Sequence, residues 1–119
     1  MKNFRDLQVW QKAHELTLQV YRLTGKFPSH ELYGLVSQVR RACVSIPAKL
    51  AEGCCRQGDR EFARFVQIAM ASASEAEYLL LLSGDLGYIT ASERETLLAN
   101  VEEVKRMLAS LLSKLNTAH

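Results

Sequence analysis

The sequence predicts an all-α protein, an antiparallel up-and-down four-helix bundle in which residues 1–119 form a single domain. Apolar residues recur at every third or fourth position over four long segments, which is the period of an amphipathic helix. Short stretches with glycine or proline separate most of these segments, so consecutive helices are expected to run in opposite directions. No segment carries a convincing strand pattern. The composition, 48% hydrophobic and 24% charged residues, suits a small globular core.

The first helix is expected over residues 5–24, before Gly25 and Pro28 interrupt the pattern. The residues of its apolar stripe are Val9, Ala13, Leu16, Val20 and Leu23. The second helix is expected to begin at Ser29, whose side chain can cap a helix N-terminus, and to end near Gly53. The residues of its stripe are Leu32, Val36, Val39, Cys43, Ile46 and Leu50.

Pro47 lies inside the second expected helix. Proline lacks a backbone N–H and crowds the carbonyl four residues earlier, here that of Cys43, at a cost of about 3 kcal/mol in an isolated helix. Ile46 and Leu50 keep the apolar stripe in phase across the proline, so we expect one kinked helix. Ser45 could bridge the freed carbonyls, or it could cap a new helix after a break.

The third helix is expected to begin at Asp59, which can accept hydrogen bonds from free backbone N–H groups, and to end at the sequence GDLGY. The residues of its stripe are Phe62, Val66, Ala69, Ala73, Ala76 and Leu80. The fourth helix is expected to begin at Thr90, which matches a capping box with Glu93. The residues of its stripe are Leu97, Val101, Val104, Leu108, Leu111 and Leu115.

Charge and cysteine content argue against several classes of protein. The formal net charge of +2 is far below that of a dedicated basic nucleic-acid module. The N-terminal segment lacks the continuous apolar core of a signal peptide, and the longest apolar run, YLLLL, is too short to cross a bilayer. We therefore expect a cytoplasmic protein without a membrane partner. The three cysteines, an odd number, favour reduced thiols.

The titratable residues predict no enzyme, no metal site and no cofactor. His14, His30 and His119 share no helical face, so they cannot form a catalytic or metal-binding pair within one helix. Cys54 and Cys55 lack a second pair of ligands at the spacing of a zinc site. A reactive thiol there would need an exposed, electropositive setting, which the neighbouring sequence RQGDR offers only weakly.

Three motifs resemble the small bacterial four-helix-bundle proteins of the intervening-sequence or S23 ribosomal protein family: YGLVSQVRRA, VSIPAKLAEG and LGYI. The similarity covers nearly the whole chain. Cys54 and Cys55 depart from the family pattern, which argues against a family function based on cysteine. The resemblance implies the same fold and a homopentameric ring. More distant relatives are accessory proteins of diversity-generating retroelements, which implies a reverse transcriptase and RNA or DNA as candidate partners.

Six basic residues between positions 40 and 64, against three acidic ones, are the candidate nucleic-acid contacts: Arg40, Arg41, Lys49, Arg56, Arg60 and Arg64. On the third helix Arg60 and Arg64 lie one turn apart and Arg56 precedes them, so these three can face a partner together. Lys49 points about 180° away from Arg40 in an ideal helix, so the six do not form one continuous track. The alternative is that all six are ordinary solvated charges in ion pairs.

The third helix carries more apolar surface than its stripe accounts for, which predicts a homo-oligomer interface. Phe65, Ile68, Leu79 and Leu82 are expected on one flank, and Met70 and Leu81 on the other. Small residues in AMASASEA would allow another helix to approach closely. Exposed apolar surface of this breadth usually marks an interface.

Three functions remain open at this point. The first is a non-enzymatic accessory protein that associates with nucleic acid as a homo-oligomer. The second is an oligomeric scaffold that binds only protein, and the third is an enzyme whose site is built between subunits. Salt-sensitive binding to RNA or DNA distinguishes the first from the second.

Overall fold

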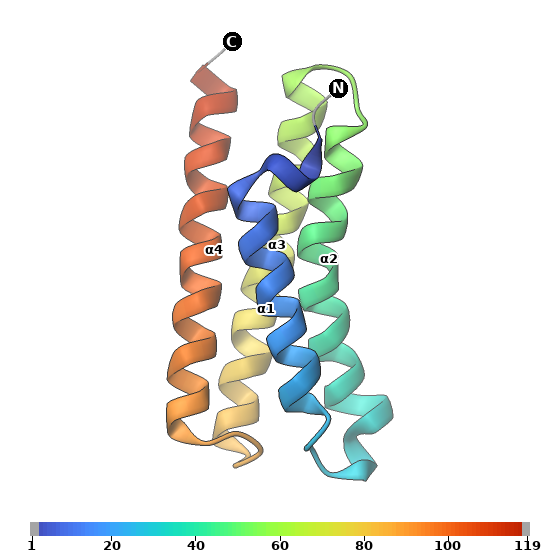
Figure 1. The fold of residues 1–119 in the computed structure, drawn as a ribbon, viewed down its shortest axis with the longest axis vertical. Coiled ribbons are helices and arrows are strands. Elements are labelled where there is room, and N and C mark those ends of the chain that lie inside the picture. Colours follow the sequence, from blue (N-terminus) through green and yellow to red (C-terminus); the bar gives the residue numbers. More distant parts are fainter. Residues whose placement is uncertain (1–2, 118–119) are drawn as a thin grey trace.

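The computed structural model describes residues 3–117 and shows an all-α four-helix bundle of 47 × 23 × 20 Å (Figure 1). The four long helices are α1 (Gln8–Thr24), α2 (Ser37–Cys54), α3 (Gly58–Asp85) and α4 (Ala91–Thr117). They alternate in direction along the bundle, so the predicted up-and-down topology is confirmed. A short 3-10 helix, Phe4–Asp6, precedes α1.

Each helix packs against two others, so that α2 and α4 both lie between α1 and α3. The α2–α3 turn and both described chain ends lie at one end of the bundle, and the α1–α2 and α3–α4 connections lie at the other (Figure 1). The predicted stripes form the single core between the helices. Twenty of their twenty-three residues are buried, and the exceptions are Leu23, Leu32 and Leu111.

The start of the second helix differs from the prediction. A 3-10 turn (Ser29–Glu31) and a π turn (Leu32–Val36) precede α2, and the side chain of Glu31, not that of Ser29, accepts the capping hydrogen bond, from Leu35 N–H. Gly34 has non-helical backbone angles, φ −110° and ψ −109°. This interruption shifts the helical phase, and Leu32 is therefore exposed.

Helix α2 runs through Pro47 without a break, so Ser45 does not cap a new helix, and the predicted kink stays a prediction. The carbonyl of Cys43, which loses its usual donor at the proline, lies 3.2 Å from the hydroxyl oxygen of Thr17 on α1. The same Thr17 hydroxyl lies 2.8 Å from the carbonyl of Ala13. Ser45 instead accepts a hydrogen bond from Ser72 on α3, at 2.8 Å. Helix α1 thus supplies a hydrogen-bond donor to the carbonyl that lacks its usual donor at Pro47.

The N-termini of the last two helices follow different rules. At α4 the capping box is confirmed, because Thr90 N–H donates to Glu93 Oε1 at 2.9 Å and Glu93 N–H donates to Thr90 Oγ1 at 3.0 Å. Helix α3 begins at Gly58, and its N-cap residue is Gln57, whose side chain makes no capping hydrogen bond, so Asp59 does not occupy the predicted N-cap position. Asp59 lies in the first turn, where a negative charge complements the helix dipole.

The flanks of α3 are largely covered within one chain. Phe65 and Leu79 are each only 4% exposed, so the prediction that they form an oligomer interface is wrong. The reason is that α3 packs against α2 on one flank and α4 on the other, and it buries a wider arc than one stripe. Three others are half-buried: Ile68, Met70 and Leu82. Leu81 is 43% exposed.

Candidate nucleic-acid interface

Arg56, Arg60 and Arg64 form one group, the arginine cluster, at the end of the bundle where α2 turns into α3. Gly58 begins α3 with φ +82°, a conformation that glycine adopts without penalty. The turn is therefore tight enough to bring Arg56, which follows the end of α2, next to the first turns of α3. All three arginines are exposed.

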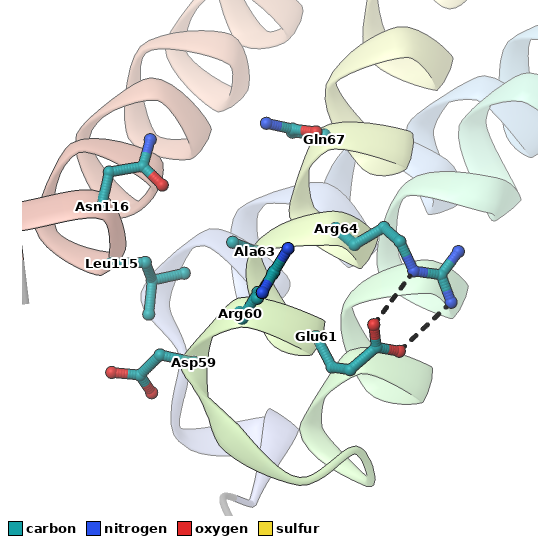
Figure 2. A pocket seen from close by; sticks show the side chains of 8 residues that line it. All are labelled: Asp59, Arg60, Glu61, Ala63, Arg64, Gln67, Leu115 and Asn116. Carbon is teal, nitrogen blue, oxygen red and sulfur yellow. Dashed lines mark hydrogen bonds and ion pairs between the residues drawn. The ribbon is translucent and has the colours of Figure 1, made fainter. Parts of the chain in front are cut away.

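Phe65 connects two members of the arginine cluster. The guanidinium carbons of Arg56 and Arg64 lie 5.0 Å and 4.8 Å from the centre of its ring, within the range of a cation–π interaction. Arg64 also donates two hydrogen bonds to the carboxylate of Glu61, at 3.4 Å and 3.3 Å (Figure 2). Arg60 makes no hydrogen bond or ion pair with any residue between 3 and 117. Its charge is therefore available to a ligand.

An open cleft of about 760 Å³ lies beside the arginine cluster, between the first turns of α3 and the last turn of α4 (Figure 2). Two apolar residues that line it, Ala63 and Leu115, are buried. Its other lining residues are polar or charged: Asp59, Arg60, Glu61, Arg64, Gln67 and Asn116. The cleft offers hydrogen-bond donors from amides and guanidinium groups, and acceptors from the carboxylates of Asp59 and Glu61, around an apolar base.

The other predicted basic residues lie elsewhere, so the set of six does not form one site. Arg40 donates to Thr24 Oγ1 at 2.9 Å and to the Tyr21 carbonyl at 3.3 Å, and it stacks over the Tyr21 ring. Lys49 pairs with Glu52 at 3.2 Å. Arg41 is exposed, but fifteen residues of α2 and its turn place it roughly 20 Å from Arg56 along the bundle.

The remaining candidate groups fit structural roles. Among residues 3–117 no three His, Cys, Asp or Glu side chains are placed to share a metal ion. Burial raises the pKa of Cys43 to about 12, so this thiol stays protonated and unreactive. Cys54 is buried and Cys55 is exposed. His14 stacks on the Trp10 ring at a centroid distance of 5.0 Å. His119 lies outside the described residues.

One contact that sequence reasoning missed closes the opposite end of the bundle. Tyr88 donates its hydroxyl to Glu31 Oε2 at 2.9 Å, and the Tyr88 ring packs against Phe27. The two hydrogen bonds that Glu31 accepts, from Tyr88 and Leu35, lower the pKa of its carboxyl. The hydrogen bond to Glu31 also raises the pKa of Tyr88. Tyr88 belongs to the motif LGYI, and this motif was the sequence feature that could have indicated the contact.

The residue pattern of the 23S rRNA-intervening sequence protein family matches residues 5–110, most of the chain. The chain belongs to this family. The family resemblance seen in the sequence is thereby confirmed, while the relation to retroelement accessory proteins stays a prediction.

A solved relative supports both the family and the fold. It is the crystal structure of a protein of unknown function from the S23 ribosomal protein family of Bacteroides thetaiotaomicron VPI-5482. It is 25% identical, the match covers 87% of this chain and 97% of the other, and the TM-score is 0.79. No curated protein matches the chain.

The fold of this intervening-sequence protein also explains why one of its helices has the composition of a membrane-spanning segment. Helix α3 is long enough and apolar enough to cross a bilayer by length and composition, with a mean hydropathy of 1.2 over its most apolar window. Its apolar stripe is nevertheless buried against α2 and α4. Packing in the bundle core therefore accounts for the apolar stripe of α3.

Proposed function

We propose that this intervening-sequence protein is a non-enzymatic, cytoplasmic accessory protein. It assembles as a homopentameric ring and contacts the phosphates of RNA or DNA through the arginine cluster. The observation that supports this proposal is the convergence of Arg56, Arg60 and Arg64 from the turn and α3 at one exposed end of the bundle. The pentamer follows from the family resemblance.

The contacts of the three arginines leave them able to bind phosphate. Guanidinium groups donate two parallel hydrogen bonds to a phosphate, which gives stronger and more directional binding than a single ammonium contact. Arg60 is uncommitted, and Arg56 is held only against the Phe65 ring among the contacts described. The exposed pair of Arg64 with Glu61 contributes little to stability, so a phosphate can compete for Arg64.

Ring assembly would strengthen an electrostatic attraction that is weak in one chain. Five chains that each carry +2 would carry +10 together. In a cyclic ring, equivalent residues of all subunits lie at the same height along the symmetry axis. The arginine clusters would therefore form one belt around the ring, and a single strand could contact several of them.

A second candidate is an oligomeric scaffold that binds only protein, for example a reverse transcriptase. The exposed apolar side chains on α1 and at the start of the second helix favour it, because aliphatic surface suits a protein partner. This candidate predicts assembly without salt-sensitive binding of nucleic acid.

The test is binding of fluorescently labelled single-stranded RNA and DNA, measured by anisotropy at several salt concentrations. The variant changes Arg56, Arg60 and Arg64 to Glu. If all three contact phosphates, binding should weaken at least tenfold at low salt, and the slope of log K against log salt should fall by about 2 to 3.

The matched control reverses three exposed charges away from the cluster: Arg22, Lys26 and Arg106. It changes the net charge equally, so a smaller loss with an almost unchanged slope is expected. An equal loss in both variants would refute the assignment of the cluster. Absence of binding by the parent protein at low salt would favour the scaffold.

A further inference from the structure

Most of the exposed large apolar side chains lie on one surface, which we call the α1–α2 face. Eight large apolar residues of the described chain are substantially exposed, and five of them belong to this face: Leu18, Tyr21, Leu32, Tyr33 and Val44. Tyr33 is 93% exposed. An open cleft of about 420 Å³ on this face is lined by four of the five and by Arg40 and Arg41. Exposure of these apolar side chains to water does not stabilise a single chain.

A second, smaller apolar surface lies on the outer side of α3, which we call the α3 patch. Its large side chains are Tyr78, 59% exposed, and Leu81, 43% exposed. Ser74 and Ala71, one and two turns before Tyr78, are exposed and small. A partner's side chains can therefore approach the α3 backbone closely here.

The two surfaces have opposite charge. The cleft of the α1–α2 face is lined by two arginines and by no carboxylate. Between Gln67 and Asp85, α3 has three acidic residues and no basic one. Lys105 pairs with Glu77 at 3.0 Å and Arg94 with Asp85 at 3.4 Å, which leaves Glu75 beside the patch. Neither Glu75 nor Arg41 makes an ion pair with a residue between 3 and 117.

We propose that the α1–α2 face of one chain binds the α3 patch of a second copy of this chain, with Arg41 facing Glu75. This inference rests on the proposed oligomer and identifies its contact. Helices α1 and α3 are diagonal in the bundle, so the two surfaces lie on different sides of the molecule. Because the two surfaces lie on different sides, the contact is head-to-tail. Such a contact forms a closed ring when the rotation between neighbouring chains closes, as the proposed pentamer requires.

The aliphatic residues on the α1–α2 face favour protein over nucleic acid as the occupant. Leu18, Leu32 and Val44 cannot stack on bases as aromatic side chains do. The complementary surface on the same chain favours a second copy over an unrelated protein. The assignment moves Arg41 from the nucleic-acid contacts to the subunit contact. Of the six residues first predicted for the interface, it keeps only Leu81.

The experiment measures mass by size exclusion with light scattering at micromolar concentration. Val44→Glu disrupts the α1–α2 face, and Leu81→Glu disrupts the α3 patch. Both residues are surface residues, and circular dichroism checks that each variant folds. The parent should elute near five times 13.4 kDa, and each variant near 13.4 kDa. An equimolar mixture should form a species of twice 13.4 kDa, because one intact surface of each kind remains.

Two further variants sharpen the result. Leu86→Glu changes a leucine outside both surfaces that is slightly more exposed than Leu81, and it should leave the mass of the parent unchanged. Arg41→Glu should lower the mass, and the double variant with Glu75→Arg should restore it. Failure of this rescue would overturn the proposed pairing of the two residues.

The remaining outcomes separate this inference from the proposed function. A parent of 13.4 kDa would overturn both. An oligomeric parent with unchanged Val44→Glu and Leu81→Glu variants would overturn the surfaces while the oligomer stands. Either variant remaining a dimer on its own would show a two-fold contact and overturn the head-to-tail arrangement. Loss of RNA binding by Val44→Glu without loss of mass would assign the α1–α2 face to nucleic acid instead.

Discussion

Replacing Thr17 by valine should destabilise the protein mainly because Pro47 is present. The Thr17 hydroxyl lies 3.2 Å from the Cys43 carbonyl, whose usual donor is missing at the proline. Valine has nearly the same shape and opens no cavity, so the main change is a buried carbonyl without its donor, at about 1 to 3 kcal/mol. The Thr17 hydroxyl also donates to the Ala13 carbonyl, at 2.8 Å, so the expected loss in free energy of unfolding is about 1 kcal/mol.

The dependence on Pro47 is measured by a double-mutant cycle. In the Pro47→Ala background, residue 47 regains an N–H that can donate to the Cys43 carbonyl. Thr17→Val should therefore lower the free energy of unfolding by about 1 kcal/mol less there than in the parent protein. Urea denaturation followed by circular dichroism gives the free energy of unfolding of all four proteins, and the m-value should stay constant. Equal costs in both backgrounds, within about 0.3 to 0.5 kcal/mol, would refute the role assigned to Thr17.

Two other predictions concern the two ends of the bundle. Gly53→Ala should destabilise by about 1 to 3 kcal/mol in urea melts, although alanine normally favours a helix, because the new Cβ would lie 2.9 Å from atoms of both Phe62 and Phe65. Gly84→Ala, whose Cβ meets only the flexible Arg94 side chain, is the control, and stabilisation by Gly53→Ala would contradict the packing. The lowered pKa of Glu31 means that the unfolded chain binds the proton more tightly, so stability should fall as pH drops below the ordinary value of 4.5. Tyr88→Phe removes the main cause of the lowered pKa and should flatten this decline, and an unchanged pH profile would argue against the contact.

Local patterns predicted the parts of the fold that depend on neighbours in sequence. The capping box of Thr90 and Glu93 lies within one turn, and the structure reproduces it. The prediction for Leu32 was wrong because Gly34 takes non-helical angles, and an apolar stripe does not report the backbone conformation of a glycine within it. The contact of Thr17 with Cys43 joins positions 26 apart, so it depends on how α1 and α2 are aligned along the bundle.

The candidate site, like the fold, was predictable only where its residues are close together in the sequence. Arg56, Arg60 and Arg64 are close in sequence, so helical spacing sufficed to group them. Phe65 was misplaced because the width of the buried arc on α3 depends on the two helices that flank it. The exposed face of α1 and α2 was missed because it forms between segments that are distant in sequence, and each segment alone shows only scattered apolar residues.

Helix α1 has 17 residues whereas α4 has 27, so the last turns of α4 extend past α1 at the arginine end. Leu108 and Leu115 are buried, but Leu111 and Leu112 between them are only half-buried. Backbone amides in these turns should exchange with solvent through small local openings, which require far less free energy than unfolding of the whole bundle. The end that carries the arginine cluster can therefore change its shape locally while the centre of the bundle stays folded.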